Sequence, residues 1–152
     1  MYKMDSYRNK VPFLTPPLKV DLGAGQYPKE GYIRADFDPD GSDICWDFTQ
    51  GIPLPNDSVN DLYTSHFLEH FTETDAHYIM MEIFRVCMNG AKLEIRVPHA
   101  NTPQGKLPCH YRLIDEDRLT GIALWFSDGV GFKLEKMWRD GIHLSAIYTI
   151  LK

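Results

Sequence analysis

Short apolar runs that end in turn residues dominate the first two thirds of the chain. Leu18–Leu22 is rich in apolar residues and runs directly into Gly23-Ala24-Gly25, which predicts a strand followed by a tight turn. Comparable runs predict further strands at Tyr32–Phe37, Asp43–Phe48, Asp61–Ser65 and Ala91–Val97. We therefore expect several short strands, each of which ends in a loop.

After Thr72 the spacing of apolar residues changes to that of a helix. Thr72 or Thr74 can cap the first turn, and apolar side chains then recur at helical spacing up to Val86. Asn89-Gly90 is typical of a helix end, so the helix is expected to close there. A second helix is predicted over Asp115–Phe126.

The order of these elements predicts an α/β fold. Strands with helices between some of them imply a largely parallel sheet, and two alternating runs around Asp140-Gly141 add an antiparallel hairpin at the C-terminal end. The 152 residues fit a single domain, residues 1–152. Within it, residues 1–17 are polar and then proline-rich and are expected to form an N-terminal arm.

Composition and charge narrow the possible partners. The formal charge is −5 and no cluster of Lys and Arg is present, which argues against a nucleic-acid partner. No apolar run approaches the roughly 20 residues that cross a bilayer, and the N-terminal residues lack the apolar stretch of a signal peptide. The three cysteines, Cys45, Cys87 and Cys109, are widely spaced and odd in number. We expect a reduced, soluble, cytoplasmic protein with no membrane partner.

Unusual residues gather where the predicted strands end, which is where parallel sheets bind ligands. The turn Gly23-Ala24-Gly25, beside Asp21, lets a ligand approach backbone amides. Asp36 ends the next strand and can accept hydrogen bonds from ribose hydroxyls, while Phe37 offers a flat face to a purine. Asp47 follows the third strand and can meet an exocyclic amine. Turn capping is the alternative role of each aspartate.

The segments that carry these residues resemble successive motifs of class I S-adenosylmethionine-dependent methyltransferases. The resemblance covers residues 18–99, and it is strongest to the compact type-11-like branch. The segments are LKVDLGAG, GYIRADFDPD, DICWDF, IPLPNDSVNDLYTSHFLEHF and EIFRVCMNGAKLEIRVP. The resemblance implies a Rossmann-like fold, S-adenosylmethionine as cofactor, and methyl transfer to a small-molecule or sugar-containing acceptor. A catalytically inactive module that binds the cofactor and acts on a partner is an alternative.

The resemblance also implies roles for individual residues. Asp21 and the turn Gly23-Ala24-Gly25 would hold the methionine part of the cofactor. Asp36 would hold the ribose and Asp47 the adenine edge, and His66 would line the pocket near the sulfonium. Tyr63 is assigned to packing by default, since aromatic residues are more often core than ligand platforms. His143 is expected on the surface of a strand.

One segment departs from the family pattern. Methyltransferases of this class usually place a helix between the glycine turn and the second strand, whereas here only Gln26–Gly31 intervenes, with Pro28 and Gly31 opposing a helix. One face of the sheet is therefore expected to have a reduced set of helices. We predict that the N-terminal arm or a second subunit covers that face, which makes a homodimer a hypothesis.

The histidines suggest two further kinds of chemistry. His66, Glu69 and His70 form H-x-x-E-H, the zinc signature of inverzincin peptidases, and a metal-dependent hydrolase is the third functional alternative. That signature needs both histidines on one helical face, but this segment follows a strand, so no metal site is predicted. His99 and His110 lie after the fifth strand and are candidate general bases, because histidine titrates near neutral pH.

Overall fold

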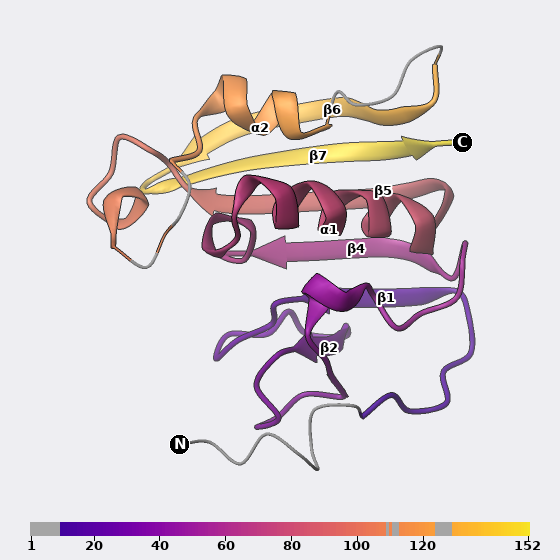
Figure 1. The fold of residues 1–152 in the computed structure, drawn as a ribbon. Helices are drawn as coiled ribbons and strands as arrows, with labels where there is room; N and C mark the ends of the chain where they lie inside the picture. Colours follow the sequence, from indigo (N-terminus) through magenta and orange to yellow (C-terminus); the bar gives the residue numbers. More distant parts are fainter. Residues whose placement is uncertain (1–9, 109, 111–112, 124–128) are drawn as a thin grey trace.

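One mixed sheet of seven strands organises the computed structural model, which describes residues 10–108, 110, 113–123 and 129–152 (Figure 1). The order across the sheet is β3-β2-β1-β4-β5-β7-β6. The strands are β1 (Leu18–Leu22), β2 (Ile33–Asp36), β3 (Ile44–Cys45), β4 (Val59–Ser65), β5 (Cys87–Pro98), β6 (Gly131–Asp140) and β7 (His143–Leu151). Every strand that the apolar pattern predicts is present. β3 is shorter than predicted because Asp47 begins a 3₁₀ helix, η1 (Phe48–Gln50).

The directions of the strands confirm the predicted class of fold. All neighbouring pairs from β3 to β5 are parallel, and β7 is antiparallel to both β5 and β6. The chain moves outward from β1 to β3 and then returns to β4 on the other side of β1. This reversal of strand order places a ligand crevice at the carboxyl ends of β1 and β4.

Helix α1 (Glu73–Val86) covers the centre of the sheet with an apolar face. Thr72 caps it, as predicted, by accepting a hydrogen bond from the Asp75 amide at 3.2 Å. Its buried residues recur every three or four positions, which is the spacing of a single helical face. They are Ala76, Ile79, Met80, Ile83 and Val86.

The predicted end of α1 at Asn89-Gly90 is wrong, because β5 begins at Cys87 and includes both residues. Cys87 is already extended and aligns with Val59 of β4. Pairing with β4 therefore prevails over the local helix-ending signal. Gly90 keeps a positive φ of 81° inside the strand.

The second helix lies on the same side of the sheet. α2 (Glu116–Ala123) contacts both α1 and β6, and the two helices lie together over one face (Figure 1). The predicted continuation of α2 to Phe126 lies outside the described residues. Neither helix of the described chain combines the length and apolarity that a membrane crossing needs.

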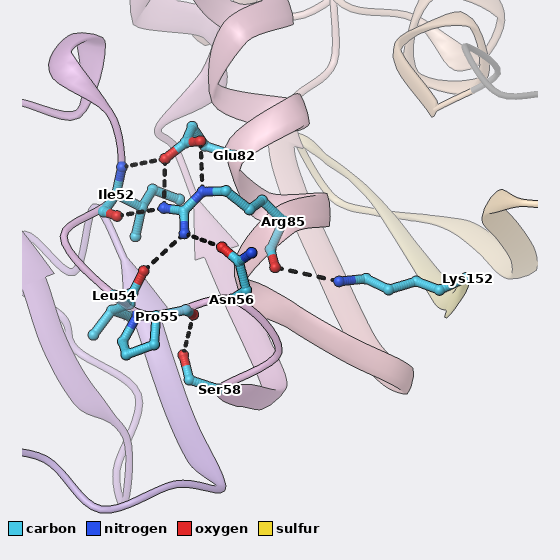
Figure 2. A network of polar contacts seen from close by, with 8 residues as sticks. All are labelled: Ile52, Leu54, Pro55, Asn56, Ser58, Glu82, Arg85 and Lys152. Atoms are coloured by element: carbon cyan, nitrogen blue, oxygen red, sulfur yellow. Dashed lines mark hydrogen bonds and ion pairs between the residues drawn. The ribbon is translucent and has the colours of Figure 1, made fainter.

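A network around Arg85 fastens the loop before β4 to the end of α1 (Figure 2). The Arg85 guanidinium donates two hydrogen bonds to the Glu82 carboxylate, at 2.7 and 2.8 Å. It also donates to the carbonyl of Ile52 at 2.8 Å and to that of Leu54 at 3.0 Å. Glu82 in turn accepts from the Ile52 amide at 2.8 Å. Because β4 begins directly after this loop, the network fixes the entry of a central strand.

The sheet face without helices carries charged and aromatic side chains. Leu62 points toward the helices and is buried, so its neighbours Asp61 and Tyr63 point to the opposite face. The short β1–β2 connection supplies partners there. Its Lys29 Nζ lies 3.3 Å from Glu94 and 4.2 Å from the Tyr63 ring centroid, and Tyr32 donates to Asp61 at 2.7 Å.

That connection contains no helix between residues 23 and 32, as the sequence predicts. The side chains described above on the face without helices find their hydrogen-bond and ion-pair partners in this connection and in the neighbouring strands. The cover of this face by the N-terminal arm or a second subunit, predicted from the missing helix, stays a prediction.

Candidate functional site

The turn after β1 approaches the 3₁₀ region after β4 so closely that its first residue must be glycine. Gly23 has a φ of 77° and its amide donates to the Ala35 carbonyl at 2.8 Å. A Cβ atom at this position would lie 2.3 Å from Cδ2 of Phe67. The turn therefore needs both the positive φ and the missing side chain.

Two cavities meet at this turn. The first, of about 500 Å³, lies beside the carboxyl ends of β1 and β4, and the second, of about 320 Å³, lies beside β2. They share Ala24, Gly25 and Gln26, so they adjoin each other at the turn. The first is lined also by Asp21, Gly23, Tyr27, Tyr63, Ser65, His66 and His143, and the second by Arg34, Asp36, Asp38, Asp40, Gly41 and Ser42.

Asp21 brings a buried carboxylate to the first cavity. Its side chain is only 1% exposed, and burial raises the pKa of this carboxyl. Oδ2 accepts a hydrogen bond from the Lys29 amide at 2.7 Å, while Oδ1 has no hydrogen-bond partner among the described residues. A buried acceptor without a partner is costly unless a ligand supplies the donor.

Asp36 lines the second cavity and also holds the turn. Its Oδ2 accepts from the Gly25 amide at 2.8 Å and its Oδ1 from the Asp38 amide at 3.0 Å. A carboxylate has about four lone-pair positions, so acceptor capacity is left for a ligand. Phe37, the predicted purine platform, is half exposed and is not among the lining residues of either cavity.

Asp47 has a local partner. Its Oδ1 accepts from the Thr49 amide at 3.0 Å and from the Thr49 hydroxyl at 2.6 Å, and it thereby caps η1. Asp47 lines neither cavity. The geometry favours the capping role that the sequence offered as the alternative, and the adenine contact stays a prediction.

His66 and His143 form one wall of the first cavity. Their rings are 4.9 Å apart, and His143 Nδ1 lies 2.8 Å from Arg96 Nη2. Burial is the main cause that lowers the pKa of both imidazoles, and Arg96 lowers it further. Both side chains therefore favour the neutral form, which does not repel a positively charged ligand.

Sequence reasoning missed Tyr63 and His143 as cavity residues. Tyr63 aligns with Asp21 across the β1–β4 pair, so strand register carries a signal that could have found it. His143 reaches the cavity because it pairs with Pro98 at the end of β5. No local pattern predicts that pairing, since it depends on where the hairpin joins the sheet.

The two predicted bases lie outside both cavities. His99 is 2% exposed and uses both ring nitrogens: Nε2 lies 2.9 Å from Glu116, and Nδ1 accepts from the Asn101 amide at 3.0 Å. This geometry favours a structural role for His99. His110 stacks edge-on against His70, with ring centroids 4.8 Å apart. Catalysis by either residue stays a prediction.

The H-x-x-E-H segment is not an α-helix. His66 has a φ of 52°, and Leu68–His70 forms the short 3₁₀ helix η2, so the geometry of an inverzincin helix is missing, as the sequence indicates. Glu69 is nevertheless buried, with 1% exposure, and burial raises the pKa of its carboxyl to about 7. His66 Nδ1 and His70 Nε2 lie 3.8 and 3.9 Å from its Oε1.

No family model matches the sequence, and no curated protein matches it either. Solved structures do match. A methyltransferase of Aquifex aeolicus that depends on S-adenosylmethionine is 14% identical, with 91% of this chain and 85% of that chain covered and a TM-score of 0.63. A protein of Thermotoga maritima described in the same terms is also 14% identical, with coverage of 90% and 83% and a TM-score of 0.63.

A third match comes from Sulfolobus solfataricus and is described as a type 11 methyltransferase. It is 16% identical, with 88% of this chain and 82% of that chain covered and a TM-score of 0.61. Identities this low establish the fold and not the reaction. The chain therefore has the class I methyltransferase fold that its sequence motifs predict.

Proposed function

We propose that the protein binds S-adenosylmethionine across the two cavities and transfers its methyl group. The observation that carries this proposal is the convergence of Asp21, the glycine turn and Asp36 on two cavities that adjoin at the turn. The unpartnered Oδ1 of Asp21 fits an ammonium donor such as the amino group of the methionine part. Asp36, with free acceptor capacity, fits the ribose hydroxyls.

When bound, S-adenosylmethionine supplies a methyl group on a positively charged sulfur. The chain's own residues would hold this group and exclude water from it. A positively charged group at the unpartnered Oδ1 of Asp21 would favour the ionised form of this carboxyl against the effect of burial, and the neutral imidazoles of His66 and His143 do not repel such a group. The charges of the first cavity therefore suit the cofactor.

A small-molecule or sugar-containing acceptor is part of the proposal. The acceptor must approach through the first cavity, whose walls include His66 and Tyr63. The absence of Asn-Pro-Pro-Tyr or Asp-Pro-Pro-Tyr after β4, where the sequence is Thr64-Ser65-His66-Phe67, supports an acceptor other than the amino group of a DNA base. A cytoplasmic location stays a prediction, and the homodimer stays a hypothesis that the charged groups on the sheet face without helices do not favour.

Calorimetric titration with S-adenosylhomocysteine tests the cofactor site. We expect one site per chain, and Asp21→Asn and Asp36→Ala should each weaken binding by about 10- to 100-fold, the cost of one hydrogen bond to a charged group. Asp43→Asn is the matched control, because Asp43 also accepts a backbone amide, that of Arg34 at 2.9 Å, but lines neither cavity. If the unchanged protein and the three variants bind S-adenosylhomocysteine with equal affinity, the proposed cofactor site is wrong.

Turnover with a panel of hydroxyl-containing acceptors then tests the reaction. Methyl transfer to any of them supports the enzyme. Tight cofactor binding without turnover across the panel would instead support the alternative of an inactive binding module.

A further inference from the structure

We propose that Glu69, His70 and His110 bind a divalent first-row transition metal ion, and that Zn²⁺ is the ion their donor atoms fit. Glu69 and His70 belong to η2 after β4, and His110 comes from the loop after β5. One donor atom from each of the three residues lies within 4.8 Å of the others. The topology thus brings together two imidazoles and a carboxylate from segments that are distant in sequence.

The buried carboxylate is the observation that points to a ligand. Glu69 is 1% exposed, and neither of its oxygens has a hydrogen-bond partner among the described residues. The two nearest imidazoles lie at 3.8 and 3.9 Å, which is too far for a hydrogen bond. A desolvated acid without partners is unfavourable, and metal coordination is one of the few ways in which a protein stabilises it.

His110 supplies a second unsatisfied group. Its Nδ1 is buried and has no hydrogen-bond partner within the described ranges. The backbone amide of His110 donates to the Leu107 carbonyl at 2.9 Å within a local turn, and the His110 ring contacts that of His70 in η2, with the centroids 4.8 Å apart. Two unsatisfied buried groups in contact with the same imidazole, that of His70, are unusual in a folded protein.

The distances leave room for coordination. Bonds of 2.0–2.2 Å in a tetrahedral site place donor atoms about 3.4 Å apart. Glu69 Oε1 and His70 Nε2 are 3.9 Å apart, and the His70 side chain is 43% exposed, so a modest rotation of that ring closes the gap. The same exposed side provides a path for an ion to enter.

The donor set selects the ion. Two imidazole nitrogens and one carboxylate oxygen suit Zn²⁺ and its first-row neighbours, whereas Mg²⁺ and Ca²⁺ prefer oxygen donors. Three protein ligands leave at least one position open for water or an oxygen of another ligand. His66, whose Nδ1 lies 3.8 Å from Glu69, also lines the first cavity, so the proposed metal site neighbours the proposed cofactor site.

This site differs from the peptidase site that the H-x-x-E-H motif suggested. There both histidines of the motif bind the metal from one helical face, whereas here His110 takes the place of His66. Binding of the ion stands independently of methyl transfer, so the two proposals can fail separately.

Calorimetry of the full chain with Zn²⁺ and absorption spectroscopy with Co²⁺ test the site. We expect one Zn²⁺ per chain, visible absorption bands of tetrahedral Co²⁺ that Zn²⁺ abolishes, and no comparable binding of Mg²⁺. Glu69→Gln and His110→Ala should each weaken Zn²⁺ binding at least tenfold. His77→Ala is the matched control, because His77 is an exposed histidine of α1 outside the cluster, and its affinity should equal that of the unchanged protein.

Thermal unfolding separates ligand loss from misfolding. Glu69→Gln removes a desolvated charge, so this variant should be as stable as the unchanged metal-free protein while losing the rise in Tm that Zn²⁺ causes. If Glu69→Gln does not fold, the Zn²⁺ affinity of His110→Ala alone tests the proposal. The proposal is overturned if Zn²⁺ does not bind, or if folded Glu69→Gln or His110→Ala binds it as tightly as the control.

Discussion

Gly23 and Gly31 have nearly the same φ but different surroundings, and this contrast separates two causes of strain. Their φ values are 77° and 80°. A Cβ on Gly23 would collide with the Phe67 side chain at 2.3 Å, whereas a Cβ on Gly31 would have no neighbour within 4 Å. The glycine turn is therefore constrained by packing as well as by φ.

We expect Gly31→Ala to lower the free energy of unfolding by about 1–2 kcal/mol, the cost of a left-handed residue with a side chain. Gly23→Ala should lower it by about 2–5 kcal/mol, because overpacking adds to that cost. Denaturant unfolding of both variants measures the difference. Equal losses would show that Phe67 gives way to the added methyl group.

Asp47 allows the capping role to be separated from cofactor binding. Asp47→Ala should lower the free energy of unfolding by about 1 kcal/mol through the lost cap on η1, and should leave the affinity for S-adenosylhomocysteine unchanged. Unfolding and calorimetry on the same variant check both values. A tenfold loss of affinity would instead support the adenine contact that the sequence predicts.

At the residue level, the sequence identified Asp21, Asp36 and His66 because each stands at the carboxyl end of a strand, and the structure places all three on the cavities. The same reasoning did not find His143 as a cavity residue, because it comes to the site through sheet pairing rather than through its local pattern. Positions set by local pattern are predictable from sequence, and positions set by distant pairing are not.

At the scale of elements, the strands and α1 were predictable because their apolar periods are strong, but the end of α1 was not. Cys87 leaves the helix to align with Val59, so a tertiary contact decides the boundary. Arg85, near that boundary, ties α1 to the loop before β4 (Figure 2). Its five donors in a fixed fork serve several acceptors at once, which Lys cannot reproduce.

Arg85→Met should lower the free energy of unfolding by about 2–3 kcal/mol, since it leaves Glu82 and the carbonyls of Ile52 and Leu54 without their donor. Arg85→Lys should recover less than half of this loss. Urea unfolding of the two variants measures both values. Full recovery by Lys would contradict a role for the planar guanidinium.

Glu82 makes the same network sensitive to pH. The Arg85 side chain is the main cause that lowers the pKa of this carboxyl below its ordinary value of 4.5, and the Ile52 amide lowers it further. A depressed folded-state pKa stabilises the fold above the ordinary pKa, and the contribution is lost as pH falls through the depressed value. The stability difference between the unchanged protein and Glu82→Gln should therefore be constant near neutral pH and shrink below about pH 4.5. Tm measured as a function of pH checks this, and a difference that grows in acid would contradict it.

At the scale of the whole molecule, the chain builds a methyltransferase fold in which both described helices lie on one face of the sheet (Figure 1). The other face carries Lys29, Asp61 and Glu94, which pair with neighbouring groups. A charged face is stable in water, and burying it against a second subunit would cost desolvation energy. The polarity of this face supports a monomer.

Light scattering at micromolar concentration measures the oligomeric state. We expect a mass near 17.5 kDa, the mass of one chain. Twice that mass would confirm the homodimer predicted from the short β1–β2 connection.

The placement of His143 in the cavity wall has a consequence for how folding and binding are linked. One side of the cavity is built by β1 and the opposite side by the first residue of β7, whose neighbour in the sheet is β5. A ligand that touches both sides favours the state in which the hairpin is docked. Saturating ligand should therefore slow hydrogen exchange of the β5–β7 amides, although most of them lie far along the strands from the binding slot.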